Sequence, residues 1–510
     1  MNKIFRIAFC GLIGAGMLSA CSDDKLDVNP TTSVSGNTLM SNPTAALVPL
    51  NGIYRSMYTA GWSTPGNTHQ CFGISAYNLM AEVMGDDMIM GDMGSGWFWF
   101  DAVYNVKARF TNNSWRSYDL WKAYTTWVSN ANAVINGETT MQGPKKEVDY
   151  VIGQAYAIRA YSYFMMAQTF ARTYAGHENE PCVPVYTKIT QAGDKGAPRS
   201  TVAQVYELVN ADIDKAVSLL EGTVQTHKSH IGYAVALGLK ARMALVQENW
   251  QAAKDAAHAA IAASNGSILP VKDFIGLNDV SKSNVMWGAE IIMDQRGQYA
   301  SLYAHMDTVL GYGKTAPKLI SRTLYNKMSA TDARRAWWNE KSPLSSTGVH
   351  QCKMTFKDPQ SWLGDYVWMR VEEMYLIAAE AECRLGDEAS AKADLMALMS
   401  QRDPNYNLNG KTGTALGKLT NEFTGSLLEE IIIQRRLELW GEAGRIYDIR
   451  RLKQGFRRVT ADGWNDKALL STRPTDNPES YMWVLTIPQS EFDGNESLDQ
   501  TKDQNPVGDL

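Results

Sequence analysis

The sequence lacks the motifs by which many enzymes are recognised. It contains no Walker loop, no Rossmann fingerprint, and neither a Gly-x-Ser-x-Gly nor a His-Glu-x-x-His pattern. An excess of basic residues is also missing, because 49 lysines and arginines stand against 54 aspartates and glutamates. The resulting net charge of −5 argues against nucleic-acid binding and against broad adhesion to anionic lipid. We predict neither a catalytic centre nor a cofactor.

The sequence is also poor in patterns that bind metal ions. Four of its six cysteines lie beyond the N-terminal segment, and none of them shows Cys-x-x-Cys spacing: Cys71, Cys182, Cys352 and Cys383. Asp86-Asp87 and Asp92 do not follow the spacing of a calcium loop, and methionines occupy positions between them. His258 lies in an alanine-rich stretch of helical character and is expected to be a surface or packing histidine. We therefore predict no metal site.

Long hydrophobic runs are absent after the N-terminus. The apolar stretch at 7–18 follows Lys3 and Arg6, is too short to span a bilayer, and leads into Leu-Ser-Ala-Cys21. These features are typical of a secretory signal peptide, and the cysteine resembles that of a bacterial lipobox, where it is acylated. We expect residues 1–20 to be a lipoprotein signal peptide and Cys21 to carry the lipid. An ordinary signal peptide with a chance cysteine is the alternative.

Helical periodicity divides the rest of the chain, which we treat as one domain over residues 43–510. Apolar residues recur at helical spacing in three parts: about 43–60, 113–263 and 370–455. Two aromatic-rich stretches lack this period and are expected to be inserts on a helical scaffold: about 61–112 and 264–369. Polar residues 21–42 are expected to be a flexible tether, and residues 456–510 an extended tail. The fold class predicted is mainly α.

Two parts of the scaffold share one spacing of small and apolar residues. Intervals of twelve, four and three residues separate Ala241, Ala253, Ala257 and Ala260. The same intervals separate Ala379, Ala391, Leu395 and Leu398. Small side chains at such positions let two antiparallel helices approach closely, as in tetratricopeptide repeats. Two alanine-rich hairpins that match by chance are the alternative.

The most densely charged stretch runs from Leu427 to Gly455. Apolar residues recur there at helical spacing, and two glycines interrupt the run, which predicts two helices meeting at a tight corner. One interpretation is an acid/base site built from Glu438, Arg445 and Asp448. We favour a structural corner, because mixed charges along helices are usually paired. The residues expected to pair with one another and with backbone carbonyls are Arg435, Arg436, Glu438, Arg445 and Asp448.

Aromatic residues of the two inserts are the candidate ligand contacts. Sugar rings present C–H groups that stack on tryptophan and tyrosine, while amides and arginines bind the hydroxyl groups. Trp97 and Trp99 alternate with phenylalanines and would share one side of an extended segment. The alternative is that the aromatic residues form the cores of the inserts. The candidates are Trp97, Trp99, Tyr77, Asn105, Arg109, Gln298, Trp337 and Trp338.

Taken together, these features resemble the SusD/RagB family of outer-membrane nutrient-binding lipoproteins. The resemblance includes the lipobox, the charged corner, and Arg159-Ala160-Tyr161 in a helix followed by a proline-containing segment. It extends to the C-terminal residues Pro488, Glu491, Asn495 and Gln504-Asn505-Pro506. The chain departs from the family pattern after Pro506, where Val-Gly replaces glycine followed by an aromatic residue.

The resemblance implies a scaffold of tetratricopeptide-like helical pairs carrying loop-rich binding regions. It also implies a non-enzymatic lipoprotein, anchored in the outer membrane by its lipid, that binds oligosaccharide and closes a SusC-like TonB-dependent transporter as a lid. Ser22-Asp23-Asp24 resembles the export signal of surface-exposed Bacteroidetes lipoproteins. Three alternatives stay open: a peptide-binding member of the family, a lipid-anchored glycoside hydrolase using Glu438 and Asp448, and a purely structural adaptor.

Overall fold

A computed structural model describes residues 40–105, 109–191 and 193–507 of the chain. The expected signal peptide, Cys21 and most of the expected tether lie outside these residues. Within them, no helix combines the length and the apolar character needed to cross a membrane. The four cysteines beyond the N-terminal segment are free thiols.

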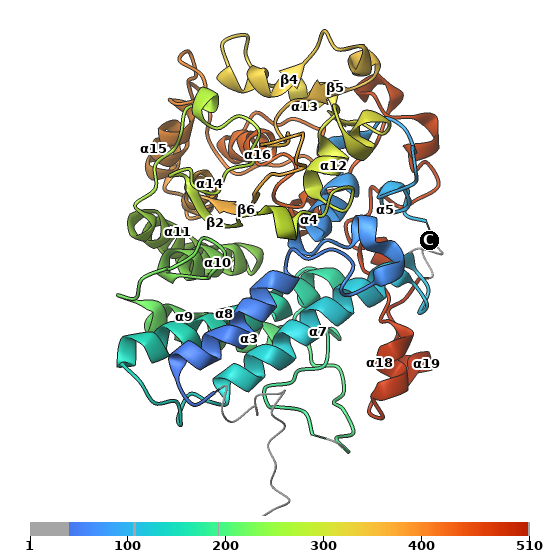
Figure 1. Cartoon of the computed structure of the whole chain (residues 1–510). Coiled ribbons are helices and arrows are strands. Elements are labelled where there is room, and N and C mark those ends of the chain that lie inside the picture. Colours follow the sequence, from blue (N-terminus) through green and yellow to red (C-terminus); the bar gives the residue numbers. More distant parts are fainter. Residues whose placement is uncertain (1–39, 106–108, 192, 508–510) are drawn as a thin grey trace, which may run out of the picture.

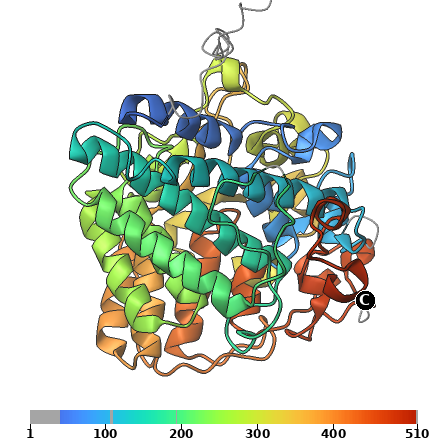
Figure 2. The same ribbon diagram turned by 90° about the horizontal axis from the view of Figure 1, so that it is seen from below.

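Four long helices form the lower part of the molecule in Figure 1 and lie next to one another when seen from below in Figure 2. They are α3 (Pro43–Ser56), α7 (Trp115–Ile135), α8 (Lys145–Phe170) and α9 (Val202–Leu220). Polar side chains satisfy the first backbone N–H groups of several of them: Asn42 caps α3, Ser114 caps α7, and Thr201 with Gln204 forms a capping box on α9.

Two helical pairs stack above this group in Figure 1. They are α10 (Tyr233–Val246) with α11 (Trp250–Ser264), and α14 (Val371–Arg384) with α15 (Glu388–Met399). All eight residues of the repeated spacing are completely buried: Ala241, Ala253, Ala257, Ala260, Ala379, Ala391, Leu395 and Leu398. The prediction of tetratricopeptide-like pairs is therefore confirmed.

The two inserts join in one small antiparallel sheet, in the strand order β1-β3-β5-β4. The first insert supplies β1 (Met88–Met90), and the second supplies β3 (Lys318–Ile320), β4 (Trp338–Asn339) and β5 (Val349–Gln351). Met88 pairs with Ile320 across the junction. A separate antiparallel pair, β2 (Val285–Ala289) with β6 (Tyr366–Arg370), leads directly into α14. Segments far apart in the sequence therefore form one loop-rich layer.

The inserts also contain short helices, which the sequence did not predict. They are α4 (Ile74–Val83), α5 (Trp99–Ala102), α12 (Leu302–Met306) and α13 (Arg322–Tyr325). Single 3-10 turns accompany them: η2 (Pro65–Gln70), η3 (Val271–Asp273), η4 (Met293–Gln295), η5 (Gly311–Lys314), η6 (Ala333–Trp337) and η7 (Pro343–Ser346). Phe98 has a left-handed backbone, with φ of 63°, and Trp99 begins a helix, so the predicted extended alternation of Trp97 and Trp99 is wrong.

The charged stretch forms α16 (Leu427–Glu438) and α17 (Arg445–Arg451), which meet at the predicted corner. Gly441 and Gly444 both have left-handed backbones there, with φ of 81° and 74°. A Cβ at Gly444 would lie 2.8 Å from the ring of Tyr447, so a larger residue would also clash. The tail contains the short helices α18 (Gln489–Gly494) and α19 (Gln500–Asp503) and the turns η8 (Thr460–Asp462), η9 (Asp466–Ala468) and η10 (Tyr481–Trp483). It is therefore less extended than expected.

Candidate ligand-binding surface

Aromatic side chains from both inserts meet at the molecular surface. Tyr299 is the most exposed of them, at 46%, and its ring centroid lies 4.8 Å from that of Trp362 and 5.4 Å from that of Tyr312. The centroid of Trp97 lies 5.3 Å from that of His69 and 5.9 Å from that of Tyr312. His69, Trp97, Tyr312 and Trp362 are half-buried. We call these five residues the aromatic surface.

Strained backbone holds part of this surface in place. Trp362 itself has a left-handed φ of 58°, and Gln298, directly before Tyr299, has a φ of 43°. Such a conformation costs a non-glycine residue about 1–3 kcal/mol, and it concentrates at binding sites because the surrounding structure must enforce it. The side chain of Asp358 accepts hydrogen bonds from the N–H groups of Gln360 and Ser361 and so shapes the turn that carries Trp362.

Polar and apolar groups surround the aromatic surface. Gln298 is exposed, and Arg296 donates a hydrogen bond to the carbonyl oxygen of Ser361 at 3.2 Å. The imidazole of His69 forms a hydrogen bond with the hydroxyl of Tyr312. Ile292 and Met293 leave half of their surface in solvent. Ring faces with nearby amide and guanidinium groups are suited to a sugar, whose C–H faces stack while its hydroxyl groups form hydrogen bonds.

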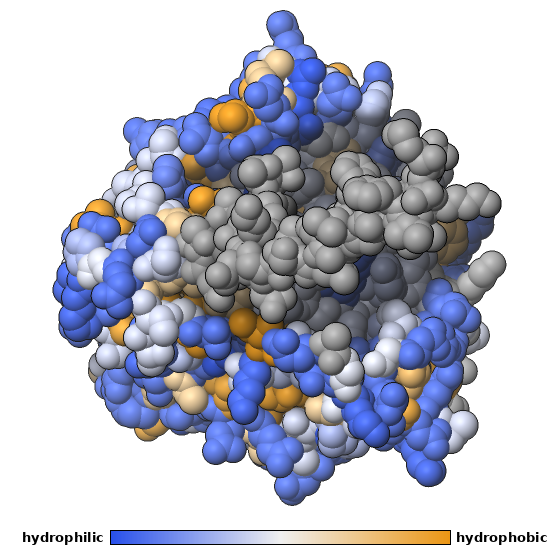
Figure 3. Space-filling model, turned by 60° about the horizontal axis from the view of Figure 1, so that its bottom comes forward, coloured by the Kyte–Doolittle hydropathy of each residue, from blue (hydrophilic) through white to orange (hydrophobic). Residues whose placement is uncertain are grey.

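The lower face of the molecule has a different character. Figure 3 shows that hydrophilic residues dominate among its coloured atoms and that hydrophobic ones occur in small separate patches. Seven of the exposed large hydrophobic residues instead belong to the two inserts: Met93, Phe100, Ile275, Ile292, Met293, Tyr299 and Val309. Single exposed hydrophobic residues need no explanation, but their number in the two inserts is consistent with an interaction surface there.

Only two of the eight candidates from the sequence, Trp97 and Gln298, belong to the aromatic surface or its edge. Asn105 is half-buried near the end of the first described segment. The other five are at most 6% exposed and have no free face for a sugar: Tyr77, Trp99, Arg109, Trp337 and Trp338. These five residues are structural residues of the inserts. Their prediction as ligand contacts is therefore wrong.

The buried candidates have clear structural partners. Arg109 pairs with Asp101 at 3.1 Å, and the ring of Tyr77 lies 5.7 Å from that of Tyr124. Trp338 packs edge-on against Trp440, with ring centroids 4.9 Å apart. The residues that sequence reasoning missed are His69, Tyr299, Tyr312 and Trp362. They are single aromatic residues in separate loops, so no local pattern distinguishes them.

The charged corner is a network of buried ion pairs. Arg435 pairs with Asp448 at 2.8 Å, whereas Arg436 and Arg445 reach the first insert and pair with Asp87 and Asp86 at 2.6 and 3.0 Å. This pairing replaces the calcium site considered for those aspartates with a structural role. The attraction between each arginine and its carboxylate offsets the free-energy cost of removing the two charges from water.

Glu438, the residue considered as a catalytic acid, is completely buried at the centre of this network. Its carboxylate lies 2.8 Å from Arg402 and 3.1 Å from Arg370. Burial alone would raise the pKa of Glu438, but these arginines hold the pKa well below its usual range. The carboxylate has no access to a substrate and no proton to donate at neutral pH.

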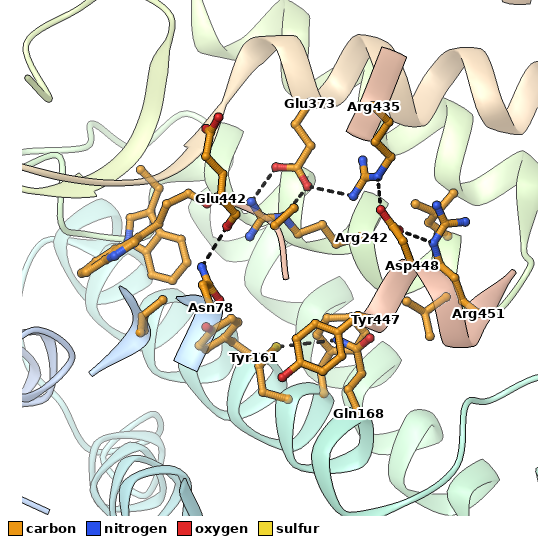
Figure 4. Close-up of a pocket in the computed structure, with 18 residues that line it drawn as sticks. Asn78, Tyr161, Gln168, Arg242, Glu373, Arg435, Glu442, Tyr447, Asp448 and Arg451 are labelled. Carbon is orange, nitrogen blue, oxygen red and sulfur yellow. Dashed lines mark hydrogen bonds and ion pairs between the residues drawn. The ribbon is translucent and has the colours of Figure 1, made fainter. Parts of the chain in front are cut away.

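A cavity of about 70 Å³ adjoins the corner and is shown in Figure 4. Glu373 lies there between Arg242 and Arg435, and Asp448 lies between Arg435 and Arg451. This volume holds only a few water molecules, whereas ligand pockets typically measure about 300–1,000 Å³. The cavity is therefore an internal feature of the ion-pair network.

A larger groove of about 770 Å³ lies between α7, the loop at 184–197 and α18. The indole N–H of Trp121 donates to Glu491 at 3.0 Å, and the amide of Asn495 donates to the hydroxyl of Tyr186 at 3.2 Å. These hydrogen bonds connect the C-terminal tail to the scaffold. Two C-terminal residues of the family resemblance, Glu491 and Asn495, therefore act in the packing of the tail.

The fold and the aromatic surface define a helical-repeat protein with a loop-borne surface of ligand-binding character. Residues 292–506 match a sequence profile described as the SusD family, and residues 73–245 match one described as starch-binding associating with outer membrane. The chain belongs to the SusD family. Its match to this family was expected from the lipobox, the corner and the C-terminal residues.

Individual relatives are distant in sequence. SusD-like protein P2 from Formosa agariphila is 23% identical over 502 residues, covering 89% of this chain and 91% of the relative. A SusD-like carbohydrate binding protein from Bacteroides vulgatus has a similar structure, with a TM-score of 0.74, 22% identity and coverage of 92% and 99%. Surface glycan-binding protein A from Bacteroides thetaiotaomicron gives a TM-score of 0.67, 16% identity and coverage of 92% and 100%. At these identities the solved structures establish the fold.

Proposed function

We propose that the chain binds an oligosaccharide on its aromatic surface. The observation that carries this proposal is the meeting of the exposed Tyr299 with the half-buried Trp97, Tyr312 and Trp362, in a region that also contains the exposed amide of Gln298 and the half-buried Arg296. The names of its structural relatives, which refer to carbohydrate and glycan binding, support the same ligand class. Flat stacking surfaces suit a chain of sugars better than a small enclosed metabolite.

Calorimetric titration of the purified protein with a panel of oligosaccharides tests this proposal. Tyr299→Ala and Trp362→Ala should each weaken binding roughly tenfold, because a stacked aromatic contact contributes about 0.5–1.5 kcal/mol beyond its buried area. Tyr118→Ala, which changes the groove beside α7, is a matched aromatic control and should leave the affinity unchanged. Binding that is lost in the control and kept in the two variants would contradict the proposal.

A peptide is the alternative ligand, since aromatic and arginine side chains also bind peptides. A peptide library in the same titration separates the two, and binding to peptides without binding to any glycan would assign the peptide role. We further propose that the protein acts without catalysis, because both carboxylates considered for hydrolysis are ion-paired with arginines and Glu438 is also completely buried. Release of reducing ends from a bound glycan, lost in Glu438→Gln, would contradict this.

We also propose that lipid on Cys21 anchors the protein on the outer face of the outer membrane, where it covers a SusC-like TonB-dependent transporter. The lipobox and the family description that refers to the outer membrane support this role. Cys21→Ala should abolish labelling by palmitate and release the protein from the membrane fraction.

Affinity purification from solubilised outer membranes should recover a β-barrel transporter, and recovery of no such partner would contradict the lid role. A purely structural adaptor would recover the partner but bind no small ligand.

A further inference from the structure

Three side chains that could bind a metal ion meet where the two helical pairs contact each other. His258 comes from α11, Glu382 from α14 and Asp394 from α15. One ligand atom of each lies within 4.8 Å of those of the other two. All three residues belong to helices of the scaffold, and none of them is part of the aromatic surface.

The carboxylate of Glu382 is the unusual member of this cluster. Its side chain is only 3% exposed, and its Oε2 has no hydrogen-bond donor among the described residues. The one ion-pair partner that the described part of the chain gives it is the imidazole of His258, at 3.6 Å. A buried carboxylate normally requires a paired charge and full hydrogen bonding. Its side chain also forms a hydrogen bond with Asp394, which is another carboxyl group, so the imidazole of His258 is the one cationic partner that the described residues give to Glu382.

Other glutamates on the same helix have such a partner. Arginines lie at ion-pair distances of 3.2, 2.5 and 2.6 Å from three of them, in the pairs Glu372–Arg370, Glu373–Arg242 and Glu380–Arg451. Near Glu382 the nearby charged group is instead the carboxylate of Asp394, which binds the same imidazole at 2.7 Å. Two carboxylates and a histidine thus converge without a lysine or arginine among their described ion-pair partners.

The geometry points to a divalent transition-metal site, with His258, Glu382 and Asp394 as ligands and zinc as the ion that best suits them. Zinc binds imidazole nitrogen and carboxylate oxygen at about 2.0–2.2 Å, so two ligands of a tetrahedral ion lie roughly 3.4 Å apart. The separations of 2.7 and 3.6 Å from the nitrogen of His258 bracket that value. His258 is 43% exposed, which leaves a path for the ion and a position for water.

Such an ion would fasten α11 of the first helical pair to α14 and α15 of the second. It neutralises both carboxylates and gives Glu382 the charged partner that arginines give to its neighbours on α14. The site therefore has a structural role in the scaffold, and it acts independently of the proposed glycan binding.

Zinc titration into the purified protein, prepared without a histidine tag and in a buffer that does not chelate metals, tests the site. One zinc ion should bind per chain and raise the thermal unfolding temperature. His258→Gln and Asp394→Asn should each weaken binding more than about tenfold, since even changes outside the first ligands of metal sites cost 10–100-fold. Both residues are partly exposed, so these variants should fold, which circular dichroism verifies.

Two further variants sharpen the test. His227→Gln removes an exposed histidine elsewhere on the chain and should leave zinc binding unchanged. Glu382→Gln keeps the shape of the side chain and should weaken zinc binding while raising the stability of the zinc-free protein. Absence of zinc binding in the natural protein would overturn the proposal. So would binding that survives His258→Gln or that disappears in His227→Gln.

Discussion

Arg436 on α16 and Asp87, directly before β1, form a buried ion pair in which Nη2 and Oδ1 lie 2.6 Å apart. The pair joins the charged corner of the scaffold to the first insert. Strand β1 then pairs with β3 of the second insert, so the corner also positions the layer that carries the aromatic surface. The corner is therefore a structural support of the two inserts.

Arg436→Ala should therefore destabilise the protein by about 3 kcal/mol, the lower end of the cost of breaking a buried pair, because the buried carboxylate of Asp87 then keeps only Arg445, at 2.9 Å. Chemical denaturation measures this loss as a lower unfolding midpoint. Arg457→Ala is the matched control, since Arg457 forms an exposed pair with Asp476 at 3.4 Å. An exposed pair of this kind contributes about 0–1 kcal/mol. Equal effects of the two variants would contradict the structural role of the corner.

Acid should unfold the protein by protonating carboxylates of the corner. Burial would raise the pKa of Asp86, but Arg445 and Arg436 lower it to about 2, and arginines likewise hold the pKa of Glu438 and of Asp448 below its usual range. Groups whose pKa is depressed in the folded state stabilise it above their unfolded pKa, near 4, and lose this contribution as the pH falls. The urea midpoint should drop steeply between about pH 4 and pH 2. An unchanged midpoint over that range would contradict the prediction.

Glu82 should act in the opposite direction at higher pH. Its carboxylate accepts the N–H of Gly444 at 2.7 Å, yet burial raises its pKa to about 7. A carboxyl group with a raised pKa stabilises the folded state in its protonated form, so this contribution grows as the pH falls from 7 toward the unfolded pKa. Glu82→Gln should flatten the rise in stability between neutral pH and about pH 5. If the stability of the variant rose by the same amount over this pH range, the rise would come from groups other than Glu82.

Local patterns in the sequence predict the scaffold well. Ala253 and Ala257 on α11, like Ala391 and Leu395 on α15, face the partner helix because the helical period alone places them there. Gly441 and Gly444 predict the corner for a similarly local reason, since each needs a left-handed backbone. Packing between helices that follow one another in the chain depends on a few residues of nearby sequence. A single sequence is therefore sufficient to predict it.

The aromatic surface could not be predicted in this way. The ring centroid of Trp97 of the first insert lies 5.9 Å from that of Tyr312 of the second, in a layer where β1 and β3 pair across the two inserts, and no spacing in either insert encodes that pairing. Trp337 and Trp338 were expected at the surface, but the inserts contain few aliphatic residues and use these tryptophans as core. Whether an aromatic residue in a loop is buried depends on its tertiary neighbours. Buried and exposed tryptophans look the same in the sequence, so residue type alone cannot distinguish them.

The close approach of the helical pairs gives a further test. Ala257 is completely buried, whereas Ala262, on the same helix, is exposed. Ala257→Leu should cost about 1–3 kcal/mol, because added volume in a packed core forces strain. Ala262→Leu should change stability by less than about 0.5 kcal/mol, as surface substitutions usually do. Thermal or chemical unfolding compares the two, and equal effects would contradict the repeat packing.

Trp362 and Trp337 separate ligand binding from stability. Trp362→Ala removes a half-buried ring of the aromatic surface, so it should weaken oligosaccharide binding roughly tenfold with little change in the unfolding midpoint. Trp337→Ala removes a ring that is 1% exposed and lies 4.9 Å from the ammonium group of Lys353, so it should cost about 3–5 kcal/mol of stability. The fraction of Trp337→Ala that stays folded should bind the ligand with normal affinity, since its ring has no face at the surface. Calorimetry combined with urea unfolding measures both quantities on the same preparations. The opposite result would be a loss of affinity in folded Trp337→Ala and none in Trp362→Ala. It would place the binding site at the buried Trp337 and contradict the assignment of binding to the aromatic surface.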